Sequence, residues 1–162
     1  MTGVQTCALP IYDQSRVDIL FEYANDIWAN HPGTYLILEH LGNNDEETTL
    51  ANGGFMLWGK MTSEYTQAVM GYDGDINYGS WQNRGYQWPN LVTYAESHDE
   101  ERMAYELRTY GNAFNGYDAK EEATAMDRLA MAHAFLLAIP GPKMMWNWGE
   151  LGYQISIFDC LN

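Results

Sequence analysis

The sequence predicts an α/β fold in which parallel strands are joined by crossover helices. Helix-like and strand-like segments alternate along the 162 residues, and such alternation is typical of parallel sheets. Each predicted strand is apolar in its body and becomes polar where it ends. A complete (β/α)8 barrel needs roughly 250 residues. The chain therefore predicts either a small open sheet or half of a barrel.

The first predicted helix covers residues 15–31, where apolar side chains recur at the spacing of one helix face. Ser15 is its expected cap, and Pro32 with Gly33 ends it. The other elements are expected in this order: a strand at 34–41, a polar loop at 43–54, a strand at 55–61, a helix at 62–72 capped by Thr62 or Ser63, a loop at 73–90, a strand at 91–97, a short helix at 99–111, a longer helix at 120–138 and a fourth strand at 141–149.

Composition narrows the class of partner. The net charge is −14, from 22 acidic and 8 basic residues, which argues against nucleic acid and against an anionic membrane surface. No apolar run approaches the roughly 18 residues of a membrane span. An acidic chain with 6 Trp and 12 Tyr suits a neutral polar partner, and sugars are the obvious class. Cys7 and Cys160 indicate neither a zinc site nor a disulfide framework.

The ends of the predicted strands carry the candidate chemistry. Glu39 ends the first strand and Asp99 the third, and two carboxylates facing one cleft suit acid/base work on a glycosidic bond. His98 could donate a hydrogen bond to a sugar hydroxyl, although a histidine with a purely structural role is also common. The other candidates at strand ends are Trp58, Trp146 and Trp148, which could stack on sugar rings, and Glu150.

The sequence gives weak support to two candidate metal sites. The segment from Asp73 to Asn77 is similar to the start of a calcium loop, but Tyr78 stands where that loop needs Gly. A metallohydrolase built on Glu39, His40 and His98 has no supporting ligand spacing.

Three segments resemble the α-amylase family, glycoside hydrolase family 13. The segment "LVTYAESHDEER" resembles the family's seventh strand, with Ser97 in place of Asn before His98 and Asp99. The segment "TYLILEHLG" resembles the fifth strand, which ends in a catalytic Glu. The segment "FLLAIPGPKMMWNWGELGY" resembles the eighth strand region. All three occur in family order, and the likeness covers about residues 12–158.

The resemblance implies a partial TIM barrel, roughly strands five to eight, from a retaining enzyme of α-glucans or maltooligosaccharides. Glu39 matches the general acid/base, Asp99 the carboxylate that grips ring hydroxyls, and His98 a contact to the same sugar. Trp58, Trp146, Trp148 and Glu150 are expected to bind substrate. Branching or transfer instead of hydrolysis is the alternative. No cofactor is implied for this chain, and calcium is possible in a full-length parent; the compartment, bacterial cytoplasm or outside, stays open.

The family's nucleophile is an Asp at the end of strand four, and no matching segment exists here. The acidic residues before Glu39 fall in or beside the first helix: Asp13, Asp18, Glu22 and Asp26. Residues 1–11 look like a translated sequencing adapter, so 12–162 is expected to be the C-terminal half of a barrel, truncated at both ends and inactive alone. Two other hypotheses are a non-catalytic carbohydrate-binding protein and a small hydrolase that uses Glu39 and Asp99 alone.

Overall fold

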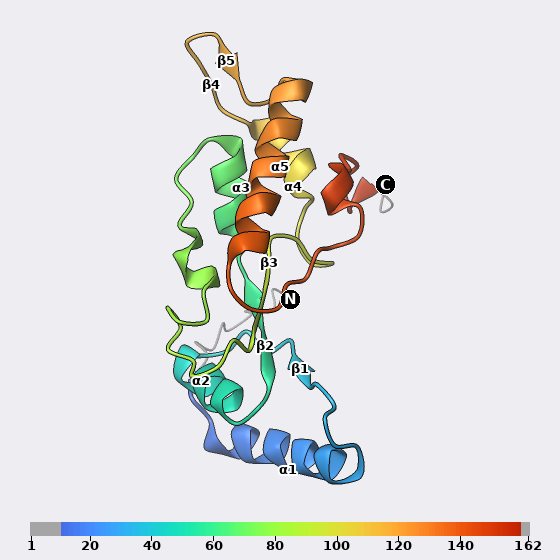
Figure 1. Ribbon diagram of the computed structural model, residues 1–162. Coiled ribbons are helices and arrows are strands. Elements are labelled where there is room, and N and C mark those ends of the chain that lie inside the picture. The colour runs from blue at the N-terminus through green and yellow to red at the C-terminus, as the bar shows by residue number, and fades with distance from the viewer. Residues whose placement is uncertain (1–10, 160–162) are drawn as a thin grey trace, which may run out of the picture.

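The computed structural model describes residues 11–159, so the adapter-like residues 1–10 and both cysteines lie outside the described range. Figure 1 shows an elongated chain with α1 at one end and the β4–β5 hairpin at the other. The elements are α1 (Gln14–Asn30), β1 (Ile37–Leu38), α2 (Asn44–Asn52), β2 (Met56–Lys60), α3 (Thr62–Met70), the 3-10 helix η1 (Ile76–Gly79), β3 (Leu91–Tyr94), α4 (Met103–Tyr110), β4 (Ala113–Phe114), β5 (Tyr117–Asp118), α5 (Glu122–Ala138) and the 3-10 helix η2 (Gly149–Leu151).

Three of the predicted strands form one parallel sheet in the order β1-β2-β3. Ile37 pairs with Met56, and Leu57 pairs with Leu91. Parallel strands that are adjacent in sequence place their carboxyl ends at one edge of the sheet. The residues that follow β1 and β3 are therefore brought to the same edge.

The predicted half-barrel is wrong. Within residues 11–159 the strands are a three-stranded parallel sheet and a two-stranded antiparallel hairpin, and they form no barrel. The fourth predicted strand, 141–149, is reduced to an isolated bridge between Thr93 and Lys143. Gly141 has a φ of +115° and Pro142 has no N–H to donate, so regular pairing cannot extend toward the start of this segment.

Two further elements depart from the expectation. Residues 43–54, predicted as a polar loop, contain α2, whose Glu46 and Glu47 are buried. The hairpin of β4 and β5 turns at Asn115 and Gly116, which both have positive φ. Positive φ at two successive turn residues is the geometry that an Asn-Gly pair favours.

All four predicted helices are confirmed, as α1, α3, α4 and α5, but the caps predicted for α1 and α3 are wrong. Asp13, not Ser15, caps α1 and accepts a hydrogen bond from the Ser15 N–H. The N-cap of α3 is Met61, which has no side chain able to cap, so the predicted Thr62 or Ser63 cap is wrong. Asp18, Glu22 and Asp26 lie in α1, as expected, and end no strand.

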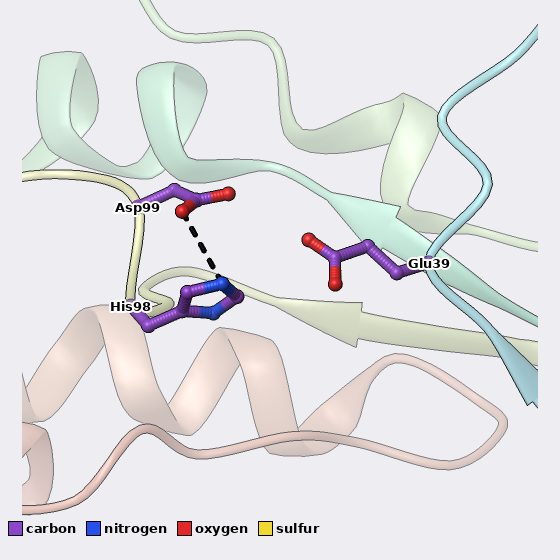
Figure 2. Close-up of side chains that lie close together, drawn as sticks. All are labelled: Glu39, His98 and Asp99. Carbon is purple, nitrogen blue, oxygen red and sulfur yellow. Dashed lines mark ion pairs between the residues drawn. The ribbon is translucent and has the colours of Figure 1, made fainter.

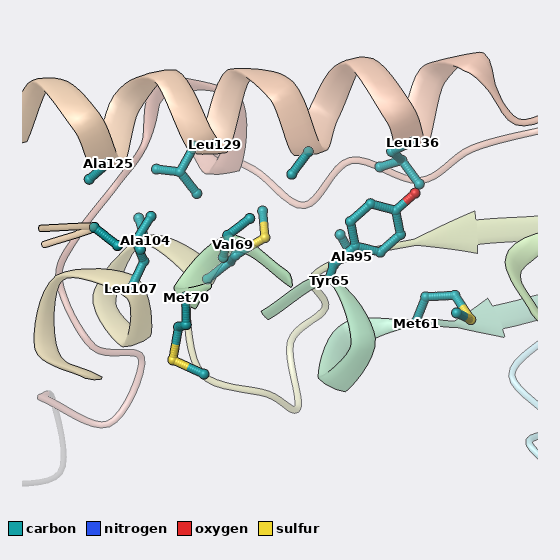
Figure 3. Packing of buried hydrophobic residues seen from close by; sticks show 13 residues of the cluster. Met61, Tyr65, Val69, Met70, Ala95, Ala104, Leu107, Ala125, Leu129 and Leu136 are labelled. Atoms are coloured by element: carbon teal, nitrogen blue, oxygen red, sulfur yellow. The ribbon is translucent and has the colours of Figure 1, made fainter. Parts of the chain in front are cut away.

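The buried apolar residues form two clusters on either side of the sheet region. One joins α3, α4 and α5, and Figure 3 shows Leu129 and Leu136 of α5 facing Tyr65 and Val69 of α3. The other packs α1 and α2 against the strands, with Phe55 and Leu57 fully buried. In the described part of the chain, no helix combines the length and hydropathy needed to cross a bilayer.

Candidate functional site

Glu39 follows directly after β1, at the carboxyl edge of the sheet. Its carboxylate is exposed, and among the hydrogen bonds of the described residues none holds it. Its position is therefore set by the backbone around it and not by a partner of its own.

His98 and Asp99 lie in the bend that follows β3. The buried Ser97 shapes this bend, because its hydroxyl accepts a hydrogen bond from the Asp99 N–H at 3.3 Å and donates one to Glu100. Ser97 thus takes part in the turn that presents the two residues after it.

The structure brings Glu39, His98 and Asp99 together. Figure 2 shows the Glu39 carboxylate pointing toward the imidazole of His98, with Asp99 beside it. His98 Nε2 lies 3.2 Å from Asp99 Oδ1, and one oxygen or nitrogen of each of the three side chains lies within 4.8 Å of the others. Residues separated by about sixty positions in the sequence therefore share one small exposed site.

Two of the predicted tryptophans flank this group. The ring centroids of Trp58 and His98 are 5.9 Å apart in an edge-on arrangement, and Trp146 lies at the same distance on a tilted plane. Both indoles are only half-buried. They supply flat aromatic surface beside the polar group.

Trp148 and Glu150 are the two remaining residues predicted to bind substrate. Both belong to the segment around η2, where Trp148 has a φ of +69° and an exposed side chain. Glu150 and His133 line a cavity of about 380 Å³ between α5 and that segment. The contacts of the described residues do not connect either side chain with Glu39, His98 or Asp99.

A pair of charged residues, Lys60 and Glu100, lies beside His98 and Asp99. Lys60, the last residue of β2, forms an ion pair with Glu100. Burial alone would raise the pKa of Glu100, but the contacts with Lys60 and Ser97 outweigh it and lower the pKa. Burial, and then the negative charges of Glu100, Glu39 and Asp99, raise the pKa of Tyr94. Lys60 could have been suspected, since it too ends a predicted strand.

Residues of both candidate metal sites have other contacts in the structure. Asp75 caps η1 by accepting a hydrogen bond from the Asn77 N–H at 3.0 Å, so this carboxylate serves a turn. His40 is bonded to Glu46 at 2.8 Å and does not join His98. Glu39, His98 and Asp99 are the one group in residues 11–159 with three side chains suited to an ion; the same oxygens and nitrogen can equally bind sugar hydroxyls.

The arrangement offers a carboxyl group able to move a proton, a carboxylate and imidazole able to hold hydroxyls, and two aromatic walls. A search of protein-family models found no match to this chain, and a search of curated proteins found no significant match.

Proposed function

We propose that this protein carries part of the active site of a retaining glycoside hydrolase that acts on α-glucans. Glu39 is the general acid/base: it protonates the glycosidic oxygen as the bond to the anomeric carbon breaks, and it later removes a proton from the attacking water. Asp99 and His98 hold the hydroxyls of the sugar on which positive charge develops.

The observation that carries the proposal is the approach of Glu39 to His98 and Asp99 within 4.8 Å. These are the three residues that the resemblance to the α-amylase family matches to catalysis. Glu39 follows β1, whereas His98 and Asp99 both follow β3, so sequence proximity does not explain the meeting of Glu39 with the other two. The flanking Trp58 and Trp146 add the surface on which a sugar ring packs.

The distance between Glu39 and Asp99 bears on whether these two carboxylates form an inverting pair. An inverting pair of carboxyl groups stands about 6.5–9.5 Å apart to leave room for a water molecule. One oxygen of Glu39 and one of Asp99 lie within 4.8 Å of each other, which argues against the two acting alone as an inverting hydrolase.

We expect residues 11–159 to bind α-glucan without turning it over. Within residues 11–159 no third carboxylate has an oxygen within 4.8 Å of the ligand atoms of all three side chains, and the acidic residues of α1 end no strand. A retaining mechanism in which Asp99 only grips hydroxyls needs another carboxylate as nucleophile. Branching or transfer would use the same residues and differ only in the acceptor.

The test is calorimetric titration of the chain with maltoheptaose, with the β-linked cellohexaose as a control sugar. We expect the chain to bind maltoheptaose. Asp99→Asn should weaken this binding, whereas Glu22→Gln, an exposed variant in α1, should leave it unchanged. Absence of maltoheptaose binding, or equal binding of cellohexaose, would overturn the proposal. Release of reducing ends by the unaltered chain would show instead that Glu39 and Asp99 suffice for hydrolysis.

A second assay separates an active site from a protein that only binds sugar. Azide can stand in for a missing nucleophile by attacking the anomeric carbon of 4-nitrophenyl α-maltoside, so that a glycosyl azide forms and 4-nitrophenolate leaves. We expect release of 4-nitrophenolate that depends on azide and is lost in Asp99→Asn. No release, together with affinity that survives Glu39→Gln, favours the non-catalytic binding protein.

A further inference from the structure

Glu39 lies between a very short strand and a sharp turn of the backbone. The strand before it is only Ile37–Leu38, and Leu41, two residues beyond, has a φ of +48°. A residue other than glycine adopts this left-handed conformation at a cost and keeps it only where the surroundings enforce it. The turn from Glu39 to Gly42 therefore needs contacts that hold it.

Helix α2 supplies these contacts through its first turn. Oε1 of Glu46 lies 2.8 Å from Nε2 of His40, the residue next to Glu39. Oε1 of Glu47 accepts a hydrogen bond of 2.9 Å from the Gly42 N–H and lies 3.8 Å from Nδ1 of His40. The two carboxylates thus hold the chain on both sides of Leu41.

Both carboxylates are deeply buried, with relative exposures of 0 % for Glu46 and 2 % for Glu47. Buried acids are rare unless they are paired, and each has an arginine partner. Arg16 of α1 binds Glu46 through Nε at 2.6 Å, and Arg84 binds Glu47 through an NH1 contact of 3.0 Å. Oε1 of Glu46 contacts both Arg16 and His40, whereas Glu47 uses Oε1 for Gly42 and Oε2 for Arg84, so each acid joins an arginine to the turn.

We propose that Glu46 and Glu47 are positioning residues, which hold the turn after β1 so that the Glu39 carboxylate faces His98 and Asp99. Neither acid is placed in contact with substrate: they act through His40 and Gly42. The consequence for catalysis rests on the proposed function, whereas the consequence for the position of Glu39 does not.

The test is a double-mutant cycle between Glu46 and Glu39. A residue that acts through Glu39 loses its effect once Glu39 is removed, whereas independent sites add. We expect Glu46→Gln to weaken maltoheptaose binding by about tenfold in the unaltered chain, which is about 1.4 kcal/mol. In the Glu39→Ala background the same change should cost no more than about twofold. The exposed neighbour variant Asp45→Asn is the matched control and should leave affinity unchanged.

The ring C–H proton signals of His98 in NMR spectra give a readout that needs no sugar. They are assigned with His98→Gln, and they report on the carboxylates that face the imidazole. Glu46→Gln should shift them in the presence of Glu39 and not in the Glu39→Ala background. Should Glu46→Gln fail to fold, His40→Phe removes the link to the turn while the pair of Arg16 and Glu46 is kept.

The outcomes separate the two proposals. Equal losses of affinity in both backgrounds would overturn the positioning role, because Glu46 would then act through overall stability. Unshifted His98 signals in folded Glu46→Gln and His40→Phe would overturn it as well. If the unaltered chain binds no maltoheptaose but the His98 signals shift as expected, the proposed function fails and the positioning role stands.

Discussion

His98 Nε2 lies 3.2 Å from Asp99 Oδ1, although consecutive residues of a strand point to opposite faces of a sheet. β3 has already ended at Tyr94, and the bend that follows turns both side chains toward Glu39 (Figure 2). An imidazole and a carboxylate can therefore reach neighbouring hydroxyls of one bound sugar.

Asp99→Asn should weaken maltoheptaose binding with little effect on folding. The side chain is more than half exposed, so we expect a change of about 0.5 kcal/mol or less in the free energy of unfolding. Hydrogen bonds to a charged group contribute about 1.5–3 kcal/mol, which corresponds to a loss of at least about tenfold in affinity. Calorimetric titration and thermal unfolding measure the two effects. Loss of affinity that merely follows loss of folded protein would contradict this prediction.

Trp58→Ala should reduce both affinity and stability. The indole packs edge-on against Tyr94 at 5.2 Å and against His98 at 5.9 Å, so its removal takes away a sugar platform and part of the packing around β3. We expect destabilisation of about 1–3 kcal/mol, because the ring is half-buried and not fully enclosed. Trp58→Phe is the control and should recover most of the stability. Chemical denaturation with tryptophan-independent detection by circular dichroism provides the measurement.

Glu46 should make stability fall in acid. Hydrogen bonds from Arg16, against the opposing effect of burial, lower the pKa of Glu46 to about 2, from an ordinary value of 4.5. A depressed folded-state pKa contributes stability that is complete above the ordinary value and is lost as the pH falls toward about 2. Glu46→Gln should therefore lose less stability than the unaltered chain between neutral pH and pH values below 4.5.

Urea titrations at several pH values follow this difference. The exposed Asp45→Asn variant should lose stability in acid to the same extent as the unaltered chain. At neutral pH Glu46→Gln should be less stable by about 1.5–3 kcal/mol, because the charge-assisted hydrogen bonds from the partly exposed Arg16 to Glu46 are weakened. Parallel curves for Glu46→Gln and the unaltered chain would show that Glu46 is not the acid-sensitive group.

The contribution of Glu96 to stability should change with pH in the direction opposite to that of Glu46. Burial raises its pKa, although its carboxylate accepts a hydrogen bond of 2.7 Å from the Met103 N–H. A raised folded-state pKa means that the ionised form opposes folding, so stability rises as the pH falls through that pKa. Glu96→Gln keeps an acceptor for Met103 and removes the charge, and it should raise the melting temperature at neutral pH.

The gain from Glu96→Gln should shrink as the pH is lowered, because the wild-type carboxyl group is then protonated as well. Scanning calorimetry at neutral and mildly acidic pH measures the difference in melting temperature between Glu96→Gln and the unaltered chain. A melting temperature that drops at neutral pH would mean that the attraction of Glu96 to Arg102 and His133 outweighs its cost of burial.

Residues at strand ends could be found from the sequence because the signals are local. An apolar run that stops at a charged residue indicates where a buried strand reaches solvent, and this located Glu39, His98 and Asp99. The hairpin after α4 has an equally local signal in Asn115 and Gly116, whose pair favours a tight turn. The extent of the sheet had no such signal. The segment at 141–149 is apolar like a strand, yet it pairs with β3 only at Thr93.

The burial of Glu46 and Glu47 in α2 could not be predicted from the sequence. An acidic stretch at 43–54 suggested a solvated loop, and the sequence alone could not show that Glu46 and Glu47 are buried. Their partners Arg16 and Arg84 are 30 and 37 residues away along the chain.

By itself the sequence determined the periodic elements, the acidic and aromatic character, and the residue types that end the strands, because these depend on neighbours within a few positions. Only the tertiary structure decided how far the sheet extends, that two acids of α2 lie in the interior, and that Glu39 meets His98 and Asp99. Burial and pairing depend on groups that come from distant parts of the chain, and the cost of an unpaired buried charge makes those partners decisive.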